Sequence, residues 1–157
     1  MKINDLDNLS KKYRKQLFEK FLLTKQGHPG SIFSMMEIVV TLYYGGYVRF
    51  NKKKKIFKDK VLISKGHATA TLYPILRDFG LIKQKDWNNW GSKNSLLKIF
   101  GNISIPGIDI TSGSLGHCIG AGAGMALHYK RSKIDKKVYV IISEGELYEG
   151  STWEALL

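Results

Sequence analysis

The chain has 157 residues, the size of one ordinary domain, and an apolar share of 43% that suffices for a hydrophobic core. No segment approaches the apolar length of a membrane helix, and the polar N-terminus lacks the apolar region of a secretory signal. The single cysteine, Cys118, cannot form an internal disulfide, so we expect a cytoplasmic protein without a membrane partner. The net charge is +12, but the basic residues are scattered apart from residues 52–55, and no aromatic-rich basic motif accompanies them. We therefore expect a lysine-rich surface and no nucleic-acid partner.

Helical spacing dominates the first part of the chain. Apolar residues recur every three or four positions over residues 5–25, which predicts an amphipathic helix, and Gly27 fits its stop. Ser34 followed three residues later by Glu37 has the spacing of a capping box and predicts a second, buried helix over residues 35–44.

The middle of the chain mixes short elements. Residues 51–58 are predicted to form an exposed loop, and residues 61–63 a buried strand. A helix is expected over residues 68–79, although Pro74 near its middle weakens that prediction. Two further short helices are expected, over residues 86–90 and 95–100.

The last third has a loop over residues 102–113, a helix over residues 115–130 and an apolar strand over residues 138–142. The helix is rich in glycine, which costs about 1 kcal/mol per residue and is tolerable where backbones pack closely. The strand has the unbroken apolar character of a parallel sheet covered on both faces. A loop over residues 143–150 and a helix from Ser151 complete an α/β pattern.

Two strands are few for a stable parallel sheet. We therefore expect residues 1–157 to be the N-terminal part of a domain that is incomplete at its C-terminus, either a fragment or one part of a split enzyme.

Polar, glycine-containing turns follow both predicted strands, at the positions where open parallel sheets bind ligands. The first is Ser64-Lys65-Gly66-His67 and the second is Ser143-Glu144-Gly145-Glu146. His67 would open a helix, where it could donate to a phosphate or make a purely structural hydrogen bond. Glu144 offers a hard oxygen ligand for Mg²⁺, although acidic turns are often only solvated.

Two other segments are ambiguous by themselves. Gly27-His28-Pro29-Gly30 projects one imidazole but is more simply a turn between helices. Gly113-Ser114-Leu115-Gly116 would let a ligand approach the backbone, although close helix packing without a ligand is the simpler explanation for this segment alone.

Taken in order, these four motifs resemble the transketolase family. They are Gly27-His28-Pro29-Gly30, the run from Leu62 to Ala68, the run from Pro106 to His117, and the run from Ser143 to Gly150. The match extends from about residue 10 to the end and corresponds to the family's N-terminal thiamine diphosphate-binding domain, in a truncated or split form. The resemblance implies a partial doubly wound parallel sheet flanked by helices, with thiamine diphosphate and Mg²⁺ or another divalent cation as cofactors.

The resemblance also implies roles for single residues. Those implied to bind the cofactor are His67, Gly113, Ser114, Leu115 and Gly145. His28 and His67 are implied to be catalytic, with His28 in contact with the substrate. Glu149 is implied to join a carboxylate network between paired subunits.

The chain departs from the family pattern at two positions. Ser143-Glu144-Gly145 stands where the family usually has Gly-Asp-Gly, so metal binding through Glu144 requires the turn to absorb one extra methylene. Asn102 stands near the place of a substrate-binding histidine. The family's remaining metal ligands and its pyrimidine-activating glutamate fall outside these 157 residues. We therefore expect a C-terminal pyrimidine-binding domain or subunit, in a homodimer or heterotetramer.

The function expected from the resemblance is transfer of a two-carbon ketol unit between sugar phosphates. A related thiamine enzyme such as deoxyxylulose phosphate synthase is the near alternative. A non-catalytic truncated remnant is the second, favoured by the departure at Ser143-Glu144. A basic nucleic-acid-binding module is a third, supported only by the charge.

Overall fold

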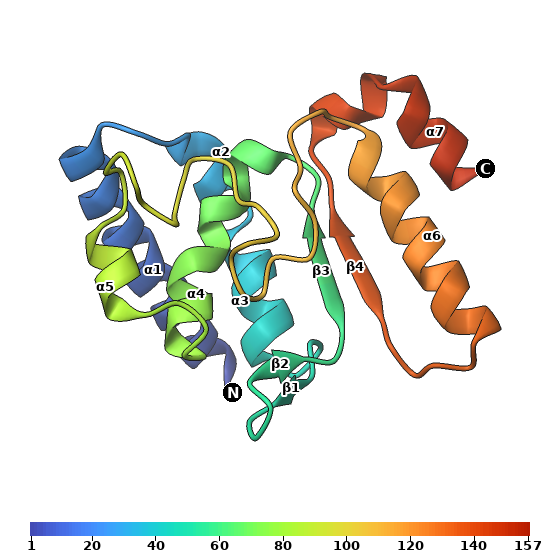
Figure 1. Ribbon diagram of the computed structural model, residues 1–157, viewed down its shortest axis with the longest axis horizontal. Helices are drawn as coiled ribbons and strands as arrows, with labels where there is room; N and C mark the ends of the chain where they lie inside the picture. Colours follow the sequence, from blue (N-terminus) through green and yellow to red (C-terminus); the bar gives the residue numbers. More distant parts are fainter.

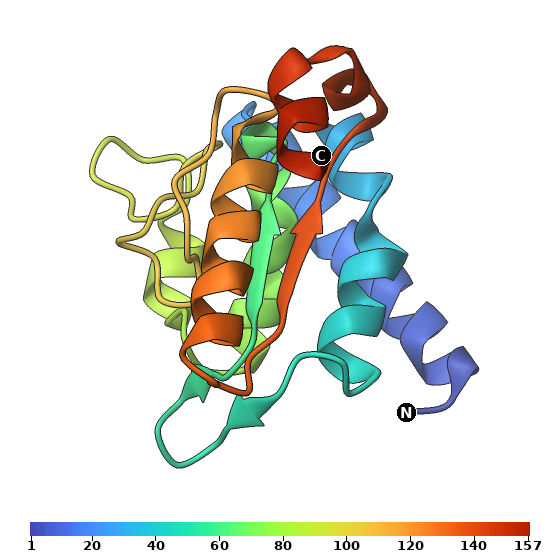
Figure 2. The same cartoon turned by 90° about the vertical axis from the view of Figure 1, so that its right-hand side faces the viewer.

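The computed structural model describes all 157 residues as three layers around a parallel pair of strands. The strands are β3 (Lys60–Ile63) and β4 (Val138–Ile141), which pair in parallel with Lys60 opposite Val138. Five helices cover one face, and α6 (His117–Arg131), with α7 (Gly150–Leu156) packed against it, covers the other (Figures 1 and 2). The α/β prediction and both predicted strands are confirmed. No helix is long and apolar enough to cross a membrane.

Helix α1 (Ile3–Thr24) forms because one face of it is apolar at helical spacing. Tyr13, Leu17 and Phe21 are buried on this face, which confirms the predicted amphipathic helix. Helix α1 packs against α3 (Met36–Tyr44). The predicted capping box at the start of α3 is wrong. The Ser34 hydroxyl donates instead to the Ser31 carbonyl, at 3.0 Å.

A helix that the sequence did not predict, α2 (Pro29–Phe33), begins inside the expected turn. Proline is favourable at the first helical position because its missing N–H has no partner there in any case. Pro74 acts in the same way downstream: the expected helix over residues 68–79 is divided into a 3-10 helix, η1 (Gly66–Leu72), and α4 (Tyr73–Asp78), with Pro74 in the first turn of α4.

Two other local predictions need correction. Residues 51–58 lie in a β-hairpin of β1 (Phe50–Asn51) and β2 (Ile56–Phe57), with the lysine run at its tip. Residues 95–100 form no helix; the Ser95 hydroxyl bonds to the backbone of Leu97 and so competes with helical hydrogen bonding. Helix α5 (Gln84–Asn88) confirms the other short helix. The predicted loop over residues 143–150 contains a 3-10 helix, η2 (Glu144–Tyr148).

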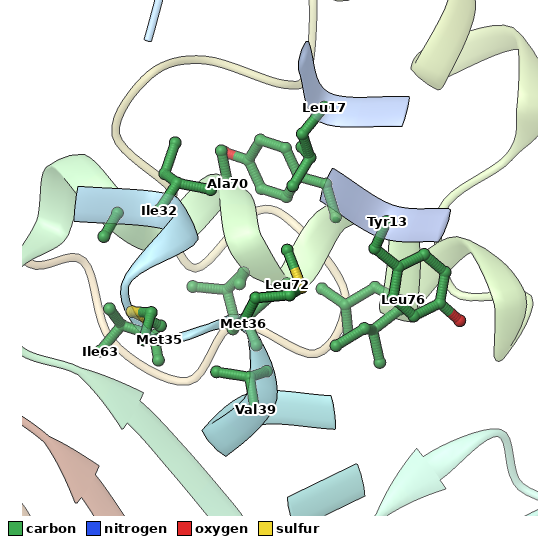
Figure 3. Packing of buried hydrophobic residues seen from close by; sticks show 14 of the residues in the cluster. Tyr13, Leu17, Ile32, Met35, Met36, Val39, Ile63, Ala70, Leu72 and Leu76 are labelled. Atoms are coloured by element: carbon green, nitrogen blue, oxygen red, sulfur yellow. The ribbon is translucent and has the colours of Figure 1, made fainter. Parts of the chain in front are cut away.

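The main core lies between the five-helix layer and the sheet. Tyr13 and Leu17 of α1 pack with Met36 of α3 and with Leu72 and Leu76 of the η1–α4 segment (Figure 3). All five side chains are almost fully buried. This core fixes η1 and α2, which lie beside the carboxyl ends of the strands (Figure 1).

Glycine allows α6 to approach the sheet. A Cβ on Gly122 would stand 2.4 Å from Cγ2 of Val140, so only a glycine fits the observed spacing. The expected burial of β4 is confirmed only in part: Ile141 is buried, and the other three residues of the strand are partly buried.

Candidate functional site

The carboxyl ends of β3 and β4 meet a cavity of about 430 Å³. Figure 1 shows the two strands ending at the same edge of the sheet, with α2, η2 and the start of α6 around them, and with the lysine-tipped hairpin at the opposite end. The cavity is lined by parts of α2 and α3 and by the two turns after the strands: Gly30, Ser31, Ser34, Met35, Ile38, Lys65, His67, Ile141, Ile142, Ser143 and Glu144. The placement predicted for the two polar turns is confirmed.

Lys65 is the main positive charge of this cavity. Its side chain is largely buried, at 8% exposure for the residue, and its Nζ donates to the Ser34 hydroxyl at 2.9 Å. It forms no salt bridge. Burial lowers the pKa of Lys65, while the nearby carboxylates of Glu146 and Glu144 oppose that change. A buried ammonium without a paired carboxylate favours an anionic ligand.

His67 and His28 lie together at this edge. The two imidazoles meet edge to face with their centroids 5.1 Å apart, and Nε2 of His67 is 3.0 Å from the Ser31 hydroxyl. Burial and the adjacent charges of His28 and Lys65 lower the pKa of His67, whereas Glu146 opposes this. His67 lines the cavity, and His28 is exposed beside it. The structure therefore brings together two histidines that are far apart in the sequence and that belong to different predicted motifs.

The segment before α6 packs directly against the turn after β3. A Cβ on Gly66 would meet the backbone oxygen of Ser112 at 2.2 Å, and the Ser112 hydroxyl donates to the Ile63 carbonyl at 2.7 Å. The three predicted cofactor-binding residues of this segment, Gly113, Ser114 and Leu115, follow at once; they adjoin the site without lining the cavity.

Gly116 and Glu149 approach each other closely beside that segment. Gly116 has a φ of 82°, and a Cβ there would stand 2.8 Å from Cβ of Glu149. The Glu149 side chain is exposed. Glu149 is therefore accessible to a second chain, as the carboxylate network predicted between paired subunits would require.

Glu144 is the one carboxylate among the cavity-lining residues. Gly145 follows it with an exposed backbone and with nothing within 4 Å of the position of a Cβ. No group of three or more His, Cys, Asp or Glu residues is arranged to hold a metal ion. A cation here would accordingly take one protein ligand from this chain, with the remaining ligands coming from phosphate oxygens and water, a coordination that Mg²⁺ accepts.

Glu146 is fully buried, and its carboxylate is held by hydrogen bonds. Its oxygens accept hydrogen bonds from the hydroxyl of Ser64, from the N–H of Gly116 at 2.9 Å, and from the N–H of Ser143 at 2.7 Å. Burial raises the pKa of Glu146, but these hydrogen bonds outweigh it and lower the pKa below its ordinary value. The group is therefore an anion at neutral pH.

Asn102 is not brought into the cavity. Its side-chain oxygen accepts from the N–H of Ser104 at 2.8 Å and so stabilises its own turn. A substrate role for Asn102 stays a prediction that would require this turn to change.

No role was predicted from the sequence for Lys65 or Glu146, although both belong to the two polar turns. The sequence does contain a signal for Glu146, because Ser143 and Glu146 have the Ser-x-x-Glu spacing of a capping box, as Ser34 and Glu37 do. Lys65 could have been recognised only from its burial, which no local pattern shows.

Residues 12–157 match the family description "Transketolase, thiamine diphosphate binding domain". The chain is 35% identical to one subunit of the apulose-4-phosphate transketolase of Phocaeicola vulgatus, over 100% of this chain and 56% of that protein. It is 30% identical to human transketolase, over 99% of this chain and 25% of that protein. A transketolase crystal structure from Campylobacter jejuni superposes with a TM-score of 0.80 at 26% identity, covering 99% of this chain and 26% of that one.

Proposed function

The chain belongs to the transketolase family, in the family's thiamine diphosphate-binding domain, and we propose that its cavity binds the diphosphate of that cofactor. The observation that carries the proposal is the buried Lys65 ammonium, which faces the cavity without a carboxylate partner. Strongly anionic groups stabilise such a charge, and the carboxyl edge of a parallel sheet is where they bind.

The side chains around Lys65 suit phosphate oxygens. The hydroxyls of Ser31 and Ser34 and the imidazole of His67 all belong to residues that line the cavity. In the structure Ser34 donates to the Ser31 carbonyl, and Ser31 and His67 are hydrogen-bonded to each other, so these donors would turn to phosphate oxygens on binding. Burial lowers the pKa of both His67 and Lys65, and a bound diphosphate would favour the charged form of each. Gly145 directly follows the cavity-lining Glu144, and its exposed backbone N–H would be a further donor.

Mg²⁺ fits this donor set through Glu144. Mg²⁺ is commonly held by one or two carboxylates together with phosphate oxygens and water. We therefore infer that Glu144 contributes one oxygen to Mg²⁺ bound with the diphosphate. Glycine at position 145 gives this turn the freedom to place a side chain one methylene longer than aspartate.

The proposed reaction is transfer of a two-carbon ketol unit between sugar phosphates. The carbanion chemistry is supplied by thiamine diphosphate when it is bound. His28, exposed beside His67, would contact the substrate near the reacting carbon, and Gly113, Ser114 and Leu115 would lie against the pyrimidine side of the cofactor. The net charge of +12 would favour the approach of anionic sugar phosphates.

A partner chain is part of the proposal. The chain spans about half the length of the Phocaeicola relative, which is itself named as one subunit of its enzyme, and a quarter of human transketolase. We infer that a pyrimidine-binding domain or subunit completes the site, in a homodimer or heterotetramer. The exposed Glu149 would then meet carboxylates of the paired subunit.

Calorimetric titration with thiamine diphosphate and Mg²⁺ tests the cavity assignment. Lys65→Met removes the ammonium while keeping an unbranched side chain, and we expect a loss of about 1.5–3 kcal/mol, roughly 10- to 150-fold in Kd. Lys60→Met is the matched control, because it removes the same charge at the other end of the same strand, where Lys60 pairs with Asp109. Equal affinities for the Lys65→Met variant and the parent would remove Lys65 from the site. A parent that binds no cofactor even together with its pyrimidine-binding domain or subunit would favour the remnant hypothesis.

A further inference from the structure

Glu146 does not line the cavity. Its carboxylate nevertheless accepts hydrogen bonds from three segments near the cavity: the end of β3, the start of α6 and the end of β4. One oxygen, Oε1, accepts from the hydroxyl of Ser64 at the end of β3 and from the N–H of Gly116 at the start of α6, the latter at 2.9 Å. The other, Oε2, accepts from the N–H of Ser143 at 2.7 Å and from its hydroxyl at 3.1 Å, where β4 ends. These segments are far apart in the sequence, and one side chain joins them.

We propose that Glu146 is a positioning residue for the cofactor site, holding the ends of β3 and β4 and the start of α6 at the spacing that diphosphate binding requires. This inference rests on the proposed function, because it assumes that the cavity takes a diphosphate. It adds a role that none of the cavity-lining groups can perform: Glu146 acts on the ligand only through the residues that it holds.

The chemistry of the surrounding groups requires a carboxylate. All four contacts to Glu146 come from donors: two hydroxyls and two backbone N–H groups. An ionised carboxylate only accepts hydrogen bonds, whereas an amide of the same shape would turn its NH₂ group toward donors. Because the residue is 0% exposed, water cannot replace a contact that is lost.

The contacts extend to the cavity through the chain itself. Ser64 directly precedes Lys65, and Ser143 directly precedes Glu144, so a displacement of either serine moves a group that we assign to the ligand. Local capping of η2 would explain the contacts to Ser143 alone. Capping does not explain the hydrogen bonds of Oε1, because their donors, Ser64 and Gly116, are 82 and 30 residues away along the chain.

Glu146→Gln is the sharpest test, since it preserves shape and removes only the all-acceptor character. In calorimetric titration with thiamine diphosphate and Mg²⁺, we expect its Kd to rise at least about tenfold. Glu19→Gln is the matched control: Glu19 is exposed on α1 and forms no hydrogen bond or salt bridge, so its variant should bind as the parent does. Parent-like affinity in the Glu146→Gln variant overturns the inference.

A second variant separates positioning from a general loss of structure. Ser64→Ala removes one of the four donors and should weaken binding severalfold. The double variant, Ser64→Ala with Glu146→Gln, should bind no more weakly than Glu146→Gln alone, because both changes act through one contact. Additive losses would overturn the inference. If Glu146→Gln does not fold, Ser64→Ala alone decides: unchanged affinity counts against Glu146, and a severalfold loss supports it.

A measurement without ligand keeps this inference distinct from the proposed function. Amide hydrogen exchange at Gly116 or at Ser143 should be faster in Glu146→Gln than in the parent, because the amide keeps one oxygen and places its NH₂ group at the other position, so one of the two N–H groups loses its acceptor. If the parent binds no cofactor even together with its pyrimidine-binding domain or subunit, the proposed function fails while this comparison still applies. Unchanged exchange at both amides would then overturn the positioning role.

Discussion

The contact between α6 and the sheet gives a prediction whose size can be worked from the structure. Gly122 and Gly124 lie on the same helix, two residues apart, in different surroundings. A Cβ on Gly122 would stand 2.4 Å from Cγ2 of Val140 and 3.4 Å from Cδ1 of Leu62, whereas a Cβ on Gly124 would meet nothing within 4 Å. The same substitution at the two positions therefore separates helix propensity from packing.

Replacing glycine by alanine inside an exposed helix stabilises it by about 1 kcal/mol, and we expect this gain for Gly124→Ala. At Gly122 the same gain is opposed by overpacking, which costs about 1–3 kcal/mol. The upper part of that range applies, because carbon atoms prefer separations of about 3.5–4 Å and Val140 is a β-branched side chain with little rotamer freedom. We predict that Gly122→Ala is about 1–2 kcal/mol less stable than the parent and about 2–3 kcal/mol less stable than Gly124→Ala.

Urea unfolding followed by circular dichroism measures both variants, with the slope of the transition checked for two-state behaviour. Thermal unfolding should agree, since about 1 kcal/mol shifts Tm by roughly 2–4 °C in a domain of this size. Equal stabilisation by Gly122→Ala and Gly124→Ala would show that α6 does not pack on β4 at the observed distance.

Three other predictions concern charge and ligands. Burial opposes ionisation of Asp59, but hydrogen bonds from Arg49 and from backbone N–H groups lower its pKa well below the ordinary value. Asp59→Ala should therefore cost about 2–3 kcal/mol at pH 7 in urea unfolding. This difference should begin to shrink as the pH falls below about 4, the ordinary pKa of an aspartate, and should be lost only as the pH falls through the lowered pKa of the folded state. The exposed Asp135→Ala should stay close to the parent. Glu144→Asp should keep or improve Mg²⁺-dependent binding of thiamine diphosphate in calorimetry, and Glu144→Ala should weaken it; parent-like binding by the alanine variant would exclude Glu144 as a ligand. In the complete enzyme, His28→Ala should lower turnover of sugar phosphates with cofactor affinity unchanged, and lost affinity would contradict its assignment to the substrate.

Periodicity and element order were enough to predict the main frame of this fold. The apolar spacing over residues 5–25 corresponds to α1, and the two apolar runs correspond to β3 and β4. Because parallel strands end at one edge, the same order placed the turns after residues 63 and 142 side by side, which the structure confirms.

Local patterns failed where a distant partner decided the outcome. Ser34 and Glu37 have capping-box spacing, but Glu37 pairs with Arg14 of α1, and the Ser34 hydroxyl donates to the Ser31 carbonyl. No pattern within a short window contains Arg14. The same limit applies to Glu146, whose contacts with distant segments exist only after the sheet and α6 have assembled.

The most direct test of the central claim compares the cavity with the rest of the basic surface. Magnesium pyrophosphate would be titrated into the ¹⁵N-labelled chain while amide chemical shifts are followed. We predict the largest shifts at residues 65–67 and 143–146, at the carboxyl ends of the two strands. Residues 52–55, the lysine tip of the hairpin at the opposite end of the molecule, should change little (Figure 1). Shifts concentrated at this lysine tip would mean that the chain attracts anions only through its net charge, and would contradict a diphosphate site between the strands.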